Sequence, residues 1–259
     1  MTIAEQNHDP LVGALARLAV PAPTSFGDRI VARWVEVDGP VGALYVAFTE
    51  LGVAYVRPAA TVAGAGEFAE SFRNHFGRPL RAATHPLAGL LPALRSGRSR
   101  TLRFDLRGLT DFERAVLLKA QQIPAGQTRP YGWVASEIGN PGAVRAVGSA
   151  LGRNPVPVLI PCHRVVRSDG RPGQYVFGSA LKESLLRAEN VNLDEVRALA
   201  AERVFFVGSD TTGVVCFPTC AHARRITTPH RRGFRNLRQA VESGYRPCRH
   251  CRPAVPESA

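Results

Sequence analysis

Five cysteines are the residues of this 259-residue chain best suited to chemistry, and their spacing divides them into two kinds. Cys216 and Cys220 form one close pair, Cys248 and Cys251 form a second, and Cys162 stands alone in the run Pro-Cys-His-Arg. In a reducing compartment such pairs more often mark a metal site than disulfides, whereas an unpaired cysteine beside a histidine is a candidate nucleophile. The sequence therefore predicts one metal site and one reactive thiol.

The lone thiol needs a partner to react at neutral pH. A free cysteine has a pKa of about 8.5, so it needs a base or an electropositive setting to become a thiolate. His163 follows Cys162 directly. In an extended segment neighbouring side chains point to opposite faces, so we expect the histidine to reach the sulfur through a bridging water or a turn. Without further support, a Cys-His dipeptide is usually accidental.

The spacing of the paired cysteines, Cys-x3-Cys followed by Cys-x2-Cys, is typical of a tetrahedral zinc site with four thiolate ligands. We prefer zinc to disulfides or an iron-sulfur cluster. A segment of about sixty residues has a small core, and a bound metal would add the stability that it lacks.

The chain is strongly basic, with a formal net charge of +12. Arginine dominates the excess, and its planar fork suits phosphate oxygens, which favours a nucleic-acid partner; a generally basic, solvated surface is the alternative. We find neither a run of about 18 apolar residues nor a signal-peptide pattern in Met1–Pro10, so we expect a cytoplasmic protein without a membrane partner.

The elements that must position these residues fall into successive regions. Strand-like runs at 30–35, 42–48 and 52–56, a helix at 67–75 and a further strand at 101–106 predict a small α+β module. The capping box Thr-x-x-Glu at 110–113 then predicts a helix to about Gln122.

A helix-turn-helix outline follows, with helices expected at 133–138 and 143–151 around a Gly-Asn-Pro turn. Helix pairs of this kind are also common in protein cores. Prolines after Asn154 predict an extended connection, and 158–160 is expected to form a short buried strand ending just before Cys162. The last helix of this region is expected at 182–189.

The run from Asn154 to Val166 closely resembles the active-site signature of the O6-alkylguanine-DNA alkyltransferases. The stretches 123–131 and 139–148 are similar to the same family with the spacing kept, so the resemblance covers roughly 110–189. It implies a single-turnover transfer in which a damaged base flips out of the duplex and gives its O6-alkyl group to Cys162. Flipping is required because the reacting atom is inaccessible inside the base stack.

The same resemblance implies the roles of the residues around the thiol. Cys162, His163 and Glu189 match a relay from cysteine through water to histidine and glutamate, with Glu189 orienting the imidazole. Asn154 matches the residue that stabilises the turn before the active-site strand. A helix-end carboxylate exposed to water is the alternative for Glu189.

Four further residues match positions that contact DNA or the flipped base. Arg145 stands where the family has the arginine finger that fills the gap left by the base, and Tyr131 where a tyrosine helps to rotate the 3′ phosphate. The carbonyl of Val165 matches one that reads the guanine amino group, and Tyr175 lies in the pocket-lining loop. A surface charge and a core aromatic are the alternatives for Arg145 and Tyr131.

The chain departs from the family after Tyr175. Val176, Phe177 and a single glycine stand where many relatives have a small residue and two glycines. A phenyl ring fills space that glycine leaves open, so Phe177 is expected to narrow the pocket and to slow reaction with O6-benzylguanine relative to O6-methylguanine.

The stretches 205–207, 211–220 and 244–253 resemble the zinc domain of the Ada adaptive-response proteins. In that family the first cysteine, here Cys216, is both a zinc ligand and the acceptor of a methyl group from a DNA methyl phosphotriester. Arg224 and Arg225 follow the second ligand as basic residues do in Ada, and they would neutralise phosphates. A purely structural zinc remains the alternative.

Together these observations predict an α+β protein that repairs alkylated double-stranded DNA with one zinc ion bound, and we expect a monomer. Methyl transfer from O6-methylguanine, with O4-methylthymine as a further candidate, is assigned to Cys162, and phosphotriester repair to Cys216. The alternative is a sensor of alkylated DNA whose zinc domain is structural or anchors DNA.

The expected organisation is a leader at 1–28, an α+β scaffold subdomain at 29–108, a helical alkyltransferase domain with the helix-turn-helix at 109–192, a linker at 193–201 and a zinc-bound α+β domain at 202–259.

Overall fold

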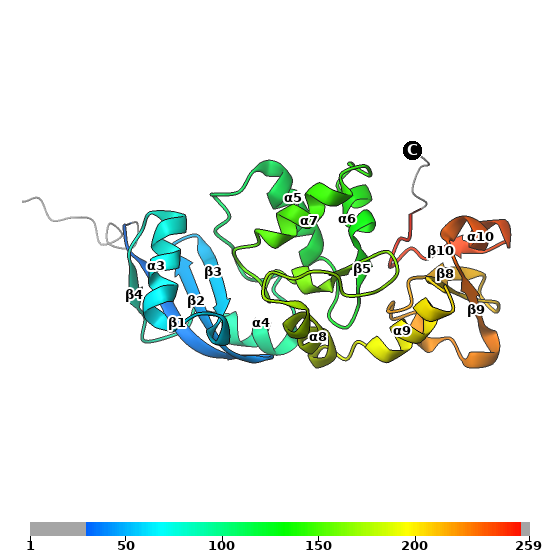
Figure 1. The fold of residues 1–259 in the computed structure, drawn as a ribbon, viewed down its shortest axis with the longest axis horizontal. Helices are drawn as coiled ribbons and strands as arrows, with labels where there is room; N and C mark the ends of the chain where they lie inside the picture. The colour runs from blue at the N-terminus through cyan, green and yellow to red at the C-terminus, as the bar shows by residue number, and fades with distance from the viewer. Residues whose placement is uncertain (1–29, 255–259) are drawn as a thin grey trace, which may run out of the picture.

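The computed structural model describes residues 30–254, which form three regions in a row (Figure 1). A sheet region comes first, a helical region lies in the middle and a cysteine region follows. The leader expected at 1–28 lies outside the described residues. None of the helices in the described part of the chain is both long and apolar enough to cross a membrane.

The sheet region is a four-stranded sheet in the order β3-β2-β1-β4, antiparallel except for the β1-β4 pair. Helix α3 covers one face, where its buried Phe68 and Phe72 pack among Tyr45 and Tyr55. The alternation of side chains turns Leu44, Val46 and Phe48 to the other face, which joins the core of the helical region. The elements are β1 (Ala32–Gly39), β2 (Gly42–Thr49), β3 (Gly52–Pro58), α3 (Ala65–Phe76), β4 (Leu80–Ala82) and α4 (Leu90–Ser96).

The prediction of a strand at 101–106 is wrong, because the structure has none there. This segment touches the sheet at one isolated bridge, between Val53 and Phe104. The contact is close, because a Cβ on Gly52 would lie 2.1 Å from the carbonyl oxygen of Arg103. The bridge consists of two hydrogen bonds, from the amide of Val53 to the carbonyl of Arg103 and from the amide of Asp105 to the carbonyl of Val53, and no further pairing follows.

The helical region contains the expected helix pair. The capping box is formed, with the side chains of Thr110 and Glu113 each bonded to the other's backbone amide. A two-stranded parallel pair, β5 with β6, lies beside α6. The elements are α5 (Asp111–Gln121), β5 (Arg129–Pro130), α6 (Tyr131–Glu137), α7 (Val144–Gly152), β6 (Val165–Val166) and α8 (Ser179–Ala188).

The prediction of a buried strand at 158–160 is also wrong, because this segment forms a turn. The amide of Ile160 donates to the carbonyl of Val156, and Val158 has a φ of 71°, outside the range of a strand. The apolar side chains are buried as expected. Burial alone could not distinguish a strand from a buried turn, and the hydrogen bonds of Asn154 favour the turn.

Helix α9 (Leu193–Ala201) occupies the range expected to be a linker and leads into the cysteine region. There a second sheet has the order β10-β8-β7-β9 and packs against α10 around Val215, Phe234, Leu237 and Ala240. The α+β class is therefore confirmed. The elements are β7 (Phe206–Ser209), β8 (Val214–Cys216), β9 (Arg231–Phe234), α10 (Leu237–Glu242) and β10 (Arg246–Pro247).

Candidate active site and metal centre

Cys162 begins a short 3-10 helix, Cys162–Arg164, directly after the buried turn. Its side chain is buried and lines a cavity of about 620 Å³. The side-chain nitrogen Nδ2 of Asn154 donates to the sulfur at 3.2 Å and to the carbonyl of Ile160 at 2.9 Å. Its side-chain oxygen Oδ1 accepts from the backbone amide of Val156 at 2.9 Å. One buried side chain thus closes the turn and holds the sulfur.

His163 points away from the cavity towards Glu189, which caps the C-terminus of α8. Its Nε2 lies 3.0 Å from Oε1 of Glu189. Its Nδ1 is buried and has no hydrogen-bond partner among residues 30–254. Cysteine and histidine are brought together by the 3-10 helix, but no direct bond between them is formed in the described chain.

Arg164 completes this centre by binding the same carboxylate. Its Nη2 lies 2.6 Å from Oε1 of Glu189, and its Nε lies 2.9 Å from Oε2. The guanidinium also donates to the carbonyls of Ile123 at 2.6 Å and Gly97 at 2.9 Å. A buried charge needs such complete pairing, and this arrangement provides it.

The surroundings determine the protonation of the relay. Burial alone would raise the pKa of Glu189, but the hydrogen bonds and charges of His163 and Arg164 lower it to about 2. Burial lowers the pKa of His163, so its imidazole is neutral at neutral pH. Because a carboxylate only accepts hydrogen bonds, Nε2 must carry the proton, which leaves the lone pair of Nδ1 available as a base.

The thiol itself is neutral at rest. Burial raises the pKa of Cys162, while the hydrogen bond from Asn154, the charge of Lys182 and the hydroxyl of Tyr175 partly oppose this effect. A buried neutral thiol is protected from adventitious reaction, and it becomes a nucleophile when a base takes its proton.

Lys182 is a site residue that the sequence did not identify. It is buried in the first turn of α8, and its Nζ donates to the carbonyl of Val165 at 2.7 Å and lies 5.8 Å from the centre of the Tyr131 ring. Burial lowers its pKa to about 8, although the charge of Cys162 opposes this. The carbonyl expected to read the guanine amino group therefore already accepts one hydrogen bond and keeps a second lone pair.

The cavity in front of the thiol brings together most of the residues expected to contact DNA. Tyr131, Arg145, Tyr175 and Val176 line it together with Cys162, and Arg145 is exposed on α7. Phe177 is not among its lining residues. The expectation that its ring narrows the pocket directly is therefore not supported, and the exposed Val176 takes that position.

Phe177 instead packs behind the loop, against a cation from the sheet region. Its ring meets that of Tyr175 edge-on at 5.7 Å, and the guanidinium of Arg57 lies 5.7 Å from it. Arg57 also stacks 3.8 Å from the ring of Tyr55 and bonds the carbonyl of Val56. No local pattern in the sequence could have revealed this contact, because its partners are far apart along the chain.

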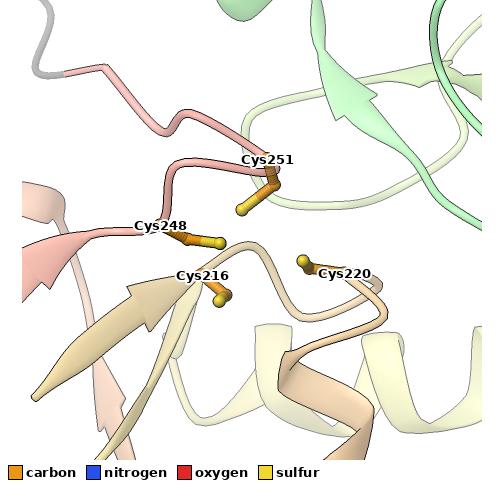
Figure 2. Close-up of side chains that lie close together, drawn as sticks. All are labelled: Cys216, Cys220, Cys248 and Cys251. Carbon is orange, nitrogen blue, oxygen red and sulfur yellow. The ribbon is translucent and has the colours of Figure 1, made fainter. Parts of the chain in front are cut away.

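The four paired cysteines converge from two segments in the cysteine region (Figure 2). All are buried, and their sulfur atoms lie within 4.8 Å of one another. Tetrahedral zinc with Zn–S bonds of about 2.3 Å places its sulfur atoms about 3.8 Å apart, so this set fits one zinc ion. The residues that would hold the ion are those predicted from the sequence, Cys216, Cys220, Cys248 and Cys251.

One ligand faces a second cavity, of about 480 Å³, which Cys216 lines while the other three cysteines do not. Arg225 lines it too, along with Arg246 and His230, which the sequence did not single out. Arg224 lies elsewhere: it lines a separate cavity of about 400 Å³ that Glu189 also borders. The two adjacent arginines therefore have different surroundings.

Two family models match the chain. The model described as 6-O-methylguanine DNA methyltransferase, DNA binding domain, matches residues 111–191, and the metal binding domain of Ada matches residues 195–254. Among solved structures, that of the OGT protein of Mycobacterium tuberculosis in complex with DNA is 31% identical, with a TM-score of 0.50, and the match covers 63% of this chain and 98% of that one. The chain belongs to the methylated-DNA–protein-cysteine methyltransferase family.

Named relatives of this methyltransferase family support the assignment over a shorter stretch. The methylated-DNA–protein-cysteine methyltransferase of Mycolicibacterium paratuberculosis is 47% identical over 88 residues, which are 34% of this chain and 53% of that protein. The protein of the same name from Methanosarcina mazei is 42% identical over 104 residues, 40% of this chain and 66% of that protein. The chain thus spans about half the length of the first of these relatives.

A second structure supports the fold alone. The O6-methylguanine-DNA methyltransferase of Pyrococcus kodakaraensis is 23% identical, with a TM-score of 0.51, and the match covers 62% of this chain and 99% of that one. In the present chain, the segment matched by the Ada model follows this fold and contains the four-cysteine cluster.

The substitution Glu189→Gln should lower stability strongly, because it leaves Arg164 buried without its anion. We expect a loss of about 3–5 kcal/mol in the free energy of unfolding, measured by urea denaturation at pH 7. Glu183→Gln is the control, because Glu183 and its partner Arg197 are both partly exposed and such pairs contribute about 1 kcal/mol or less.

The pH dependence follows from the lowered pKa of Glu189. Its stabilising contribution is complete above its ordinary pKa of 4.5 and disappears as the pH falls towards about 2. The protein should therefore lose stability between pH 5 and pH 2, and the Gln variant should lose less over the same range. Parallel pH profiles for the two proteins would contradict this role.

Proposed function

We propose that this protein repairs DNA by direct reversal, moving the methyl group of O6-methylguanine in double-stranded DNA to Cys162. The supporting observation is a buried thiol on a cavity of about 620 Å³, with a neutral His163 behind it that is polarised by ionised Glu189. The family to which the chain belongs carries out this class of reaction by name. O4-methylthymine is a further candidate substrate.

The chemistry requires one proton transfer and one substitution. Nδ1 of His163 takes the thiol proton through a bridging water, and the thiolate attacks the methyl carbon. An S–C bond forms, the bond between carbon and O6 breaks, and guanine leaves with the electron pair and takes up one proton. The thioether is stable, so Cys162 of each chain reacts once.

Access to the base requires flipping, for which α7 and the cavity provide suitable groups. Arg145 is exposed on the cavity wall, where it could replace the extruded base in the stack, and Tyr131 lines the same cavity, where it could contact the DNA backbone. The free lone pair of the Val165 carbonyl could then accept the guanine amino group. The net charge of +12 favours binding to the duplex.

We propose a second methyl acceptor, Cys216, for methyl phosphotriesters of the DNA backbone. It is the zinc ligand that lines the basic cavity shared with Arg225, and zinc keeps its sulfur as a thiolate at neutral pH. The competing function is recognition of alkylated DNA without transfer to this region, with a structural zinc. With either function we propose a cytoplasmic location, because DNA and reduced thiols are found together there.

Counting methyl groups tests both acceptors. Wild type is incubated separately with duplexes that carry labelled O6-methylguanine or a labelled methyl phosphotriester, and digested peptides are analysed by mass spectrometry. We expect one methyl group on Cys162 from the first duplex and one on Cys216 from the second. The Cys162→Ala variant should lose only the first transfer, and Cys216→Ala only the second.

The outcomes separate the candidate functions. Methyl groups on Cys162 alone, with zinc retained, would reject Cys216 as an acceptor and leave a structural or anchoring zinc region. Tight binding of methylated duplex without any methyl on Cys162 would reject the repair function in favour of the sensor.

Substrate size is tested with O6-benzylguanine. Wild type should react at least about tenfold more slowly with it than with O6-methylguanine, since even small changes in a pocket are worth about 10- to 200-fold. Val176→Gly should narrow this gap more than Phe177→Gly, because only Val176 lines the cavity. Comparable wild-type rates for the two substrates in a single-turnover assay would show that the pocket is open.

A further inference from the structure

Arg129, on β5 of the helical region, is a buried cation that the proposed chemistry does not use. It is 2% exposed, and its guanidinium donates to the carbonyl of Thr128 and to the side-chain oxygen of Gln127, each at 2.8 Å. No ion pair found within residues 30–254 includes it. A buried charge that meets only neutral groups is costly, so a counter-charge is needed nearby.

The residues around Arg129 connect it to the loop that carries the first two zinc ligands. Its guanidinium lies 5.5 Å from the ring of Phe217, which directly follows Cys216. The neighbouring Thr128 donates its amide to the hydroxyl of Thr219 at 2.9 Å, and Thr219 directly precedes the second ligand. All of these groups are buried between the helical and cysteine regions.

The segment that carries the other two ligands is fastened to the same place. The guanidinium of Arg129 lies 5.7 Å from the ring of Trp133, whose Nε1 donates to the carbonyl of Arg252 at 3.1 Å. Arg252 directly follows the ligand Cys251, and its side chain pairs with Glu137 at 2.6 Å. Arg129 therefore lies where both ligand segments meet α6.

We propose that Arg129 is the charge partner of the zinc site, so that the helical region supplies the cation that holds a metal bound by the cysteine region. Zinc with four thiolates carries a net charge of 2−, and the two segments that carry its ligands lie against this buried guanidinium through Phe217 and Trp133. Zinc binding and docking of the two regions are then one coupled event.

Electrostatics agrees with this geometry. Burial lowers the pKa of Arg129, and the charges of all four cysteines oppose that effect. β5 also pairs Arg129 with Val165, whose carbonyl accepts the hydrogen bond from Lys182. The charge pair does not depend on whether Cys216 accepts a methyl group.

Zinc affinity of the full chain measures the proposal directly. Arg129→Met keeps the length of the side chain without its charge, and it should bind zinc about 10- to 100-fold more weakly in competition with a chromophoric chelator, as for other groups outside the ligand shell. Arg129→Lys should retain affinity within about tenfold of wild type. Arg187→Met, which removes an exposed arginine paired with Asp194, is the control and should change affinity less than twofold.

Melting temperatures of the zinc-loaded and zinc-free proteins separate a charge partner from a residue that only fills space. With a charge partner, the rise in melting temperature on adding zinc is smaller in Arg129→Met than in wild type. With a space-filling residue, both forms of the variant melt lower by the same amount and zinc affinity is unchanged, which would overturn the proposal.

The lysine variant keeps the test decisive if the methionine variant does not fold. Zinc affinity near that of wild type is then the supporting result. A loss as large as that caused by removing a ligand with Cys251→Ser would overturn the proposal, because the positive charge is still present in Arg129→Lys.

Discussion

The ion pair between Arg164 and Glu189 is the contact on which the catalytic centre depends. Through the guanidinium it joins the end of α4 at Gly97 and the end of α5 at Ile123, and through the carboxylate it holds His163 and the amide of Gly126. Because both charges are buried, neither can be left unpaired without a large penalty. The same pair therefore stabilises the fold and determines which nitrogen of His163 can act as the base.

Buried or half-buried cations occur in several parts of the described chain, and each is stabilised by a different kind of partner. Arg164 is neutralised by a carboxylate, Lys182 donates to carbonyl oxygens beside the thiol, and Arg57 stacks on aromatic rings. Arg129 lies against the zinc-binding segments. In this arginine-rich chain, the cations that lie in the interior also hold separate segments of the chain together.

Within the described residues, a cavity lined by Cys162 lies in the helical region and a cavity lined by Cys216 lies in the cysteine region. The first contains a neutral thiol that must be activated by a base, while the second borders a thiolate that zinc would maintain. Helix α6 connects them, because its N-terminal Tyr131 lines the first cavity and its Trp133 bonds the segment that carries two zinc ligands. Under the proposed function, the protein would combine two chemical means of obtaining a reactive sulfur, a base for the first cysteine and zinc for the second.

The sequence by itself determined the features that depend on neighbouring residues. The capping box at Thr110, the helix pair, the first three strands and the cysteine spacing follow from local hydrogen bonding, side-chain periodicity and ligand geometry, all of which act over a few residues. The resemblance around Cys162 also pointed to Asn154, which bonds the sulfur, and to His163 and Glu189, which bond each other beside it.

Only the tertiary structure decided features that require distant segments to meet. The apolar run at 158–160 forms a turn, because Asn154 supplies hydrogen bonds to it. Phe177 lies outside the lining of the pocket, because its ring packs against Arg57 and Tyr175. Burial of Lys182 and Arg129 likewise depends on partners contributed by other elements. Local preferences cannot specify such contacts, because the energy of a buried charge is set by everything packed around it.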